Sequence, residues 1–243
     1  MISEKRVATG IIGLDGLMEG GLVPGSINLV TGKTGTGKTA FCASFIHSGA
    51  LKKEVGVYLT SEERVEDIKG DIKKMFGWNF EHLEKKGLIK FLSIRPELPR
   101  KTIREEYIAE ITKMYVYDLM SKIKSIVEKS KAKRLVIDSI SIIEAFIRDD
   151  YIRKIALMQL LDRIKELGTT TLLTGTIPET QESLSMSGIV EFLVDGVIKL
   201  EFSPIQEEFR RTLTIRKMRR TDHSIFIHPF DITSDGLKIV EII

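Results

Sequence analysis

Short apolar runs alternate with amphipathic stretches along most of the chain. The runs predict buried strands, and the stretches, whose apolar residues recur every three or four positions, predict helices. We expect strands over residues 26–31, 55–60, 88–94, 135–138 and 169–174. We expect helices from Lys38, from about Glu63 to Gly77, along a stretch that carries Ile103, Tyr107 and Ile123, and over 152–167. This order predicts an α/β fold with a mainly parallel central sheet that helices flank on both faces.

The pattern changes after Val194. Residues 194–201, 209–219 and 224–230 alternate in polarity, and Ser234-Asp235-Gly236 marks a turn before 237–242. These features predict antiparallel C-terminal strands that extend the sheet. Since no repeat or Gly/Ser-rich linker divides the chain, we expect residues 1–243 to form a single domain.

Composition narrows the class of protein. The 37 basic and 34 acidic residues give a net charge of only +3, which is weak support for a nucleic-acid partner. No apolar run has the length of a membrane span, and no signal core follows Met1, so we expect a cytoplasmic protein. The single cysteine, Cys42, excludes an intrachain disulfide and is expected to face the core.

A glycine-rich motif lies between the first predicted strand and the helix from Lys38. Residues Gly32-Lys33-Thr34-Gly35-Thr36-Gly37-Lys38-Thr39, followed by Ala40, match the Walker A pattern G-x-x-x-x-G-K-[ST]. Glycines let backbone N–H groups surround phosphate oxygens at the positive end of the helix. We expect Lys38 to reach the β- and γ-phosphates of ATP and the Thr39 hydroxyl to coordinate Mg²⁺.

Three acidic residues are candidates for the chemistry beside that loop. Asp138 ends the apolar run 135–138, where ligands of open α/β sheets bind, and is the expected carboxylate partner of Mg²⁺. Glu62 and Glu63 follow the strand over 55–60 and would emerge at the same sheet edge. They could activate water there, or they could only begin the next helix, where acids are favoured by the helix dipole.

Several further segments resemble KaiC-type ATPases of the RecA superfamily, which also includes archaeal RadA and its paralogues. The resemblance spans nearly the whole chain, and its most specific parts are the opening Gly-Leu-Asp and Gly-Gly-Leu pattern and the paired glutamates. The segments are 9–15, 20–22, 24–26, the phosphate loop, 60–63, 76–78, 137–139 and 216–219. The resemblance implies a RecA-like P-loop fold, an ATP-binding core that assembles into a ring, with a hexamer as the candidate size, and water activation by Glu62 with help from Glu63.

The resemblance also implies a basic pair that reaches the nucleotide of a neighbouring subunit. The pair maps onto Lys217 and Arg219, with His223 following. Residues two apart on a strand point to one face, so both cations could project at one phosphate. The alternative is a solvated basic strand, or one that binds acidic partners, because cations are frequent here: Arg210, Arg211, Arg216 and Arg220. Arg220 stands where the family usually has glycine.

Three functions fit these residues. The first is an oligomeric Mg²⁺-dependent ATPase that acts as a motor or switch. The second is a nucleotide-gated regulatory or assembly protein, with slow hydrolysis and an unidentified protein partner. The third is an accessory ATPase of DNA repair. DNA would bind to segments 139–151 and 175–188, but the second has Glu179 and Glu182 and no Lys or Arg, and the first has Phe146, Arg148 and Tyr151 among three acids. The sequence therefore predicts weak or no nucleic-acid binding.

Overall fold

One mixed sheet organises the chain. The computed structural model describes residues 5–95, 108–147, 149–177, 183–205 and 208–240. Within these ranges nine strands lie in the order β3-β2-β4-β5-β1-β6-β7-β8-β9. Their bounds are β1 (Ile27–Gly32), β2 (Gly56–Thr60), β3 (Ile89–Ser93), β4 (Arg134–Asp138), β5 (Thr170–Thr176), β6 (Gly196–Ile205), β7 (Glu208–Met218), β8 (His228–Thr233) and β9 (Gly236–Ile239).

Strands β1 to β6 run parallel, and β7, β8 and β9 extend the sheet antiparallel. This confirms the predicted α/β fold with antiparallel C-terminal strands. Parallel strands end at a common edge, so the segments that follow β1, β2 and β4 emerge close together. In the register, Thr60 at the end of β2 lies opposite Asp138 at the end of β4.

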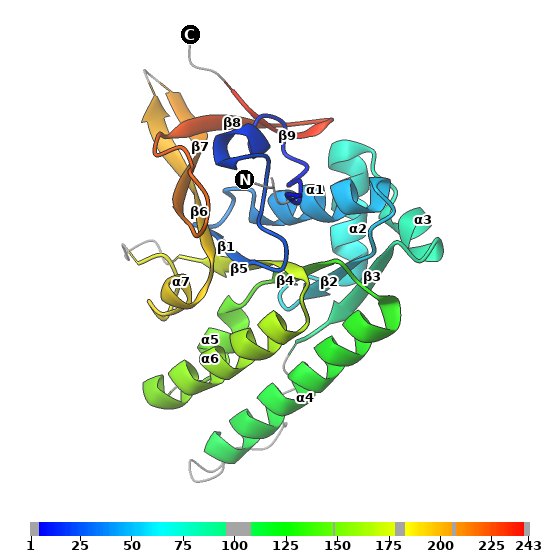
Figure 1. The fold of residues 1–243 in the computed structure, drawn as a ribbon, viewed down its shortest axis with the longest axis vertical. Coiled ribbons are helices and arrows are strands. Elements are labelled where there is room, and N and C mark those ends of the chain that lie inside the picture. Colours follow the sequence, from blue (N-terminus) through cyan, green and yellow to red (C-terminus); the bar gives the residue numbers. More distant parts are fainter. Residues whose placement is uncertain (1–4, 96–107, 148, 178–182, 206–207, 241–243) are drawn as a thin grey trace.

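Helices cover both faces of the parallel part of the sheet (Figure 1). One face carries α1 (Lys38–Leu51), α2 (Val65–Phe76) and α3 (Phe80–Lys85). The other carries α4 (Ile108–Ser130), α5 (Ser141–Phe146), α6 (Asp150–Glu166) and α7 (Val190–Leu193). A short 3-10 helix, η1 (Asp15–Met18), packs with the first layer. None of the helices in the described ranges combines the length and the apolarity needed to cross a bilayer.

Most predicted elements are present, with shifted ends. Helix α2 ends at Phe76, and Gly77, the predicted stop, caps it in the left-handed conformation with φ 69°. The strand predicted over 224–230 is wrong in its first half, because β8 begins only at His228. Residues 225–227 lie exposed in the preceding loop, where the Ser224 N–H donates to the Leu17 carbonyl. The predicted positions Ile103, Tyr107 and 241–242 lie outside the described residues.

An aromatic stack joins the first helical layer to the C-terminal hairpin. The rings of His47, on α1, and Trp78 lie 4.1 Å apart and nearly parallel. Gly236 packs against the same ring, since a Cβ there would come within 3.1 Å of it. Phe76 touches the same ring at 4.5 Å between centroids. The stack therefore fixes α1, α2 and β9 relative to one another.

A buried arginine links β4 to α1 and to the N-terminal segment. The Arg134 side chain is 1% exposed and pairs with Glu54 at 2.7 Å. It also donates to the backbone carbonyls of Ala8 and Phe45, each at 2.8 Å. Each of the three guanidinium nitrogens thus meets an acceptor, and the Phe45 ring lies 4.6 Å from the guanidinium carbon, which compensates for burial of the charge.

Candidate active site

The glycine-rich loop joins β1 to α1 in the conformation that its sequence predicts. Gly35 and Gly37 have φ values of 79° and 104°, which side chains with a Cβ rarely adopt. A Cβ on Gly32 would lie 2.3 Å from the Leu200 carbonyl oxygen of the adjacent strand. The loop is therefore tight against β6 at its start and turns sharply into the helix.

The Lys38 ammonium lies over this loop. Its Nζ donates to the carbonyls of Gly32 and Lys33, at 2.8 and 2.9 Å. Burial lowers the pKa of Lys38, although the carboxylates of Asp138 and Glu62 oppose the shift. The loop thus carries a cation that its own carbonyls hold beside the first turn of α1.

Thr39 meets Asp138 across the cleft. The Thr39 hydroxyl donates to Asp138 Oδ2 at 3.0 Å, although the residues are 99 positions apart. Asp138 also accepts from the Tyr58 hydroxyl and from the Thr174 hydroxyl, each at 2.6 Å. Burial and the Asp138 charge raise the pKa of Tyr58 well above its usual range, so this phenol remains a donor. Two oxygen donors therefore face the cleft from positions fixed by neighbouring strands, a donor set that fits Mg²⁺.

Glu62 and Glu63 lie in the turn between β2 and α2. Since α2 begins at Val65, they precede the helix rather than form its first turn, which contains Glu66 and Asp67. The Thr60 hydroxyl fixes the turn by donating to the Glu63 carbonyl at 2.8 Å. The Ser139 hydroxyl donates to the Glu62 carboxylate. Burial raises the pKa of Glu63, with further contributions from Asp138 and Asp71.

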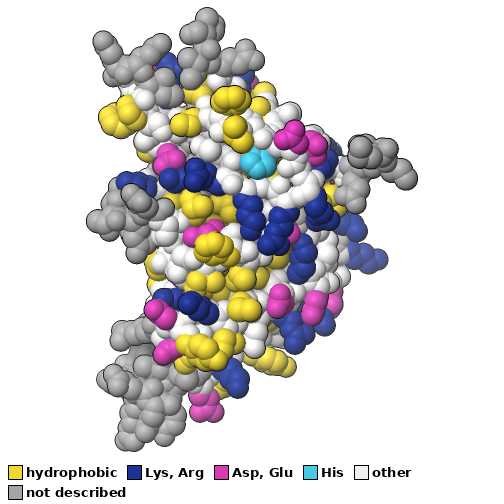
Figure 2. Space-filling model, turned by 60° about the vertical axis from the view of Figure 1, so that its left-hand side comes forward, with side chains coloured by type: hydrophobic (Ala, Val, Ile, Leu, Met, Phe, Trp, Pro, Cys, Tyr) yellow, Lys and Arg dark blue, Asp and Glu magenta, His cyan; other side chains and the backbone are white. Residues whose placement is uncertain are grey.

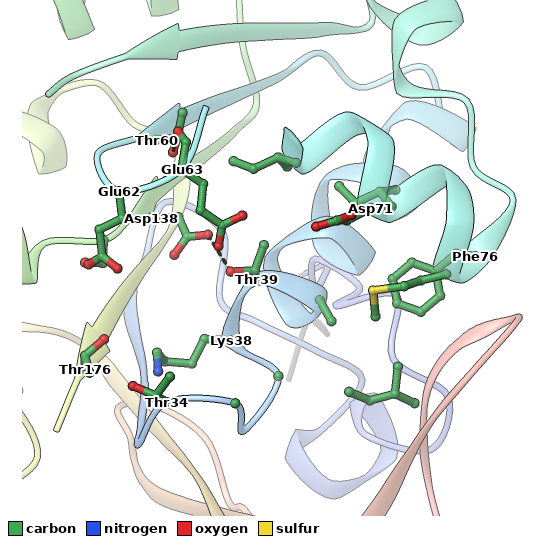
Figure 3. Close-up of a pocket in the computed structure, with 18 of the residues that line it drawn as sticks. Thr34, Lys38, Thr39, Thr60, Glu62, Glu63, Asp71, Phe76, Asp138 and Thr176 are labelled. Atoms are coloured by element: carbon green, nitrogen blue, oxygen red, sulfur yellow. Dashed lines mark hydrogen bonds between the residues drawn. The ribbon is translucent and has the colours of Figure 1, made fainter. Parts of the chain in front are cut away.

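These side chains line one cleft of about 380 Å³. In Figure 3 the acids lie on one side of it and Lys38 and Thr34 on the other. Ten lining residues were not predicted as site residues: Thr60, Ile68, Asp71, Ile72, Met75, Phe76, Ser139, Thr176, Arg211 and Ile232. Ile68, Ile72, Met75 and Phe76 share the apolar pattern of α2, which by itself indicates only packing against the core.

The predicted basic pair lies at the opposite edge of the sheet. Lys217 pairs with Val197, next to Leu29 of β1, whereas the phosphate loop follows Gly32 at the other end of that strand. The Lys217 ammonium donates to the carbonyls of Glu191, Phe192 and Val194. Burial and Arg219 lower the pKa of Lys217.

Arg219 and His223 follow in the same region. Arg219 Nη1 lies 3.9 Å from the Asp195 carboxylate, and the His223 ring contacts the Ser224 carbonyl at 3.0 Å. Lys217, Arg219 and His223 do not line their own chain's cleft. Arg220 adopts φ 59°, so a bulky residue occupies a left-handed turn position that suits glycine.

The two segments predicted as DNA channel loops are only partly described. Helix α5 occupies 141–146 of the first, and Tyr151 is 72% exposed at the start of α6. Arg148, Glu179 and Glu182, and the side chain of Phe146, lie outside the described residues. The described parts of the second segment are 175–177, at the end of β5, and 183–188, which contains serines, Leu184, Met186 and Gly188.

The chain matches known proteins along nearly its whole length. A family profile described as "ATPase: KaiC" matches residues 7–242. The chain belongs to the KaiC-type ATPase family. A UPF0273 protein of Thermotoga maritima is 34% identical over 97% of this chain and 96% of its own length. The circadian clock oscillator protein KaiC of Synechococcus elongatus is 32% identical over 96% of this chain, which spans 44% of that protein.

A solved structure supports the same assignment. A KaiC-like protein from Pyrococcus horikoshii OT3 superimposes with a TM-score of 0.83 and 37% sequence identity, over 98% of this chain and 99% of that one. The KaiC-type fold of this chain therefore has the mainly parallel sheet and antiparallel C-terminal strands typical of RecA-like ATPases. The more specific relation to RadA paralogues stays a prediction from the sequence.

Proposed function

We propose that this KaiC-type chain binds MgATP in the described cleft and hydrolyses it to ADP and phosphate. The observation that carries the proposal is the contact between Thr39 and Asp138 over the phosphate loop, at 3.0 Å. A hydroxyl on the loop and a carboxylate at the end of a distant strand have no structural need to meet there. Together they form the oxygen pair that a metal-bound triphosphate requires.

The phosphate loop and Lys38 bind the β- and γ-phosphates. Glycine conformations at positions 35 and 37 leave backbone N–H groups of the loop accessible at the start of α1. The Lys38 ammonium exchanges its contacts with the Gly32 and Lys33 carbonyls for phosphate oxygens. Ala40 continues the first turn of α1 beside them.

Thr39 and Asp138 hold Mg²⁺, which neutralises charge on the phosphates when it is bound. Tyr58 and Thr174 keep the Asp138 carboxylate oriented by donating to both of its oxygens. This arrangement suits Mg²⁺ because the ion usually takes one or two protein oxygens together with phosphate and water.

Glu62 orients the attacking water and accepts its proton, and Glu63 assists. Both side chains line the cleft on the side opposite Lys38 (Figure 3). The Ser139 hydroxyl fixes the Glu62 carboxylate. Burial and the neighbouring acids Asp138 and Asp71 raise the pKa of Glu63, and a carboxylate of higher pKa holds a proton more strongly, which supports an assisting role for Glu63 in proton transfer.

The far end of the cleft binds the base. Ile72, Met75 and Phe76 of α2 and Ile232 of β8 make that end apolar. A planar base presents apolar faces to such side chains, whereas the ribose and phosphates lie toward the polar loop. Arg211 also lines the cleft, and its Nε is buried and has no hydrogen-bond partner among the described residues.

Lys217, Arg219 and His223 serve the cleft of a second copy in a ring-shaped homo-oligomer. They lie at the amino edge of the sheet, away from their own phosphate loop, so a phosphate contact requires a neighbouring subunit. The side of the molecule that carries β6, β7 and α7 displays hydrophobic side chains beside Lys and Arg (Figure 2). Phe192, Ile225 and Phe226 are each more than 70% exposed, which favours burial in an assembly.

A nucleotide-gated switch with slow hydrolysis is the second candidate. The Lys217 ammonium is bound to carbonyls of its own α7, so assembly and release of this side chain could limit turnover. Mass measurement with and without ATP separates the two functions. An ATP-dependent change of oligomeric state with negligible turnover would favour the switch.

Hydrolysis by two site variants tests the ATPase. We expect Glu62→Gln to bind ATP but to lose about 10²- to 10⁴-fold in turnover, the usual value of a general base. Lys38→Ala should lose both binding and turnover. Glu66→Gln, on the exposed first turn of α2, is the matched control and should hydrolyse ATP at the wild-type rate. Wild-type turnover in both site variants would refute the assignment.

A further inference from the structure

The segment between β5 and β6 connects the cleft to the basic pair. We call residues 183–195 of this segment the α7 link. One end lies against the site. The Thr31 hydroxyl, in the residue before Gly32, donates to the Leu184 carbonyl at 2.5 Å. The Ser187 N–H donates to the buried carboxylate of Glu144 at 2.9 Å, and Glu144 belongs to the helix that follows Asp138.

The other end of the α7 link holds the basic pair. Lys217 Nζ donates to the carbonyls of Val194, Glu191 and Phe192 at 2.7, 3.0 and 3.3 Å. These carbonyls belong to the carboxyl end of α7, where the helix dipole favours a cation. Arg219 donates to the Phe192 carbonyl at 3.5 Å.

Glu191 joins the two ends. Its backbone carbonyl accepts from Lys217, and its carboxylate accepts from the Leu184 N–H at 3.3 Å and from the Ser185 hydroxyl. Leu184 is the residue that Thr31 contacts from the strand of the phosphate loop. A set of hydrogen bonds therefore runs from Thr31 of β1, the residue before the phosphate loop, through Leu184 and Glu191 to Lys217.

The ammonium of Lys217 has only three protons, and α7 accepts from this group at three carbonyls. Lys217 cannot keep these contacts and also bind a phosphate. A contact with a neighbour's nucleotide would leave the last carbonyls of α7 without this donor. Because α7 has only four residues, losing this cap would loosen it together with the contacts of Glu191.

We propose that Glu191 is a positioning residue that couples two active sites. Nucleotide in a neighbouring cleft draws Lys217 away from α7. The contacts of Glu191 then change, and this change alters the phosphate loop of the chain that supplies Lys217. The inference rests on the proposed function, because it needs Lys217 to serve a second copy. In this proposal, the nucleotide clefts of neighbouring chains affect one another through the contacts of α7, Leu184 and Thr31.

Hydrogen exchange tests the release of α7. At a protein concentration that supports assembly, saturation with Mg²⁺ and the non-hydrolysable analogue AMP-PNP should speed exchange of amides 189–196. In Lys217→Ala these amides should exchange fast in both states. Unchanged exchange of 189–196 in the wild type on adding AMP-PNP would overturn the inference, whether or not the chain hydrolyses ATP.

Steady-state kinetics tests Glu191 itself. We expect turnover to rise sigmoidally with ATP concentration in the wild type and hyperbolically in Glu191→Ala, with the coupling of about fivefold typical of linked sites lost. Glu191→Gln should restore the sigmoidal curve, since its amide can still meet Leu184 and Ser185. Glu201→Ala, which removes an acid of the next strand paired with Lys199 at 2.6 Å, is the matched control.

The outcomes separate the two proposals. If Lys217→Ala slows turnover while Glu191→Ala keeps the wild-type curve, the proposed function stands and the role of Glu191 is refuted. If Glu191→Ala and Glu191→Gln are equally impaired and both have lowered unfolding temperatures, the residue is structural only, and the inference falls. Absence of hydrolysis in the wild type refutes the proposed function, and the exchange measurement still decides whether α7 responds to nucleotide.

Discussion

His47 shows how one side chain can give stability a pH dependence. Its ring is half-buried against Trp78, and this burial lowers its pKa from the ordinary 6.5. Between the lowered pKa of the folded state and the ordinary value of 6.5, the unfolded chain binds more protons at His47 than the folded chain does. The stability contribution is therefore present above pH 6.5 and is lost as pH falls through this window.

We expect the unfolding temperature of the nucleotide-free protein to fall more steeply between pH 7.5 and 5 in the wild type than in His47→Phe. Phenylalanine keeps an aromatic ring against Trp78 and removes the titrating group. Thermal unfolding at several pH values measures the difference. Parallel curves for the two proteins would show that His47 does not contribute.

At this scale the sequence predicts the polar half of the cleft well. Gly32 to Thr39, Asp138 and the two glutamates follow strand ends, and parallel strands bring such residues to one edge. It does not predict the apolar half. Ile232 comes from a hairpin near the C-terminus, and Arg211 is one of several cations on its strand, so neither has a local pattern that distinguishes it.

The ion pair of Arg134 and Glu54 joins β4 to the segment after α1, and its contribution to the free energy of unfolding can be estimated. Arg134, at the start of β4, is held by Glu54, which follows α1 and is one-third exposed. Removing Glu54 leaves a guanidinium in the core with only backbone acceptors. We expect Glu54→Ala to lower the free energy of unfolding by about 2 kcal/mol, less than for a fully buried pair because water can reach this position.

Chemical denaturation would measure this loss. The control is Asp118→Ala, which breaks the exposed pair of Asp118 and Lys122 on α4 and should change the free energy of unfolding by about 0.5 kcal/mol or less. Equal losses in both variants would mean that the burial of Arg134 does not strengthen its ion pair.

Elements were predictable when they were long or fully apolar. The strands at the centre of the sheet and the buried faces of α2, α4 and α6 have clear periodicity. Helices α3, α5 and α7 have four to six residues, too few for a helical period to be evident. The exposed Ile225-Phe226-Ile227 resembled a strand because an apolar run does not reveal whether a core or another molecule covers it.

At the scale of the whole molecule, the proposed ring makes each active site depend on two chains. The variant Lys38→Ala disables a chain's own phosphate loop. The double variant Lys217→Ala, Arg219→Ala instead removes the basic pair that a chain supplies to its neighbour. Each variant alone should be inactive. An equal mixture that assembles at random should regain roughly a quarter of wild-type turnover, because half of the loops are intact and half of their neighbours supply intact cations.

ATP hydrolysis by the mixture, after exchange of subunits, checks this complementation. The control mixes each variant with Glu66→Gln, which keeps both the phosphate loop and the basic pair. This mixture shows how much activity remains when only one of the two kinds of chain is defective. A mixture no more active than the two variants measured apart would mean that Lys217 and Arg219 do not act on a neighbouring cleft.

The stack around Trp78 also gives the protein a built-in optical signal. Trp78 is the chain's single tryptophan, and its ring contacts both His47 of α1 and Gly236 of the C-terminal hairpin. Phe76, which touches it, and Ile232, in the same hairpin, both line the cleft. Binding of MgATP there should therefore change the tryptophan emission, and a fluorescence titration would follow nucleotide occupancy without any label. An emission spectrum that MgATP leaves unchanged would mean that the hairpin and α2 do not respond to the cleft.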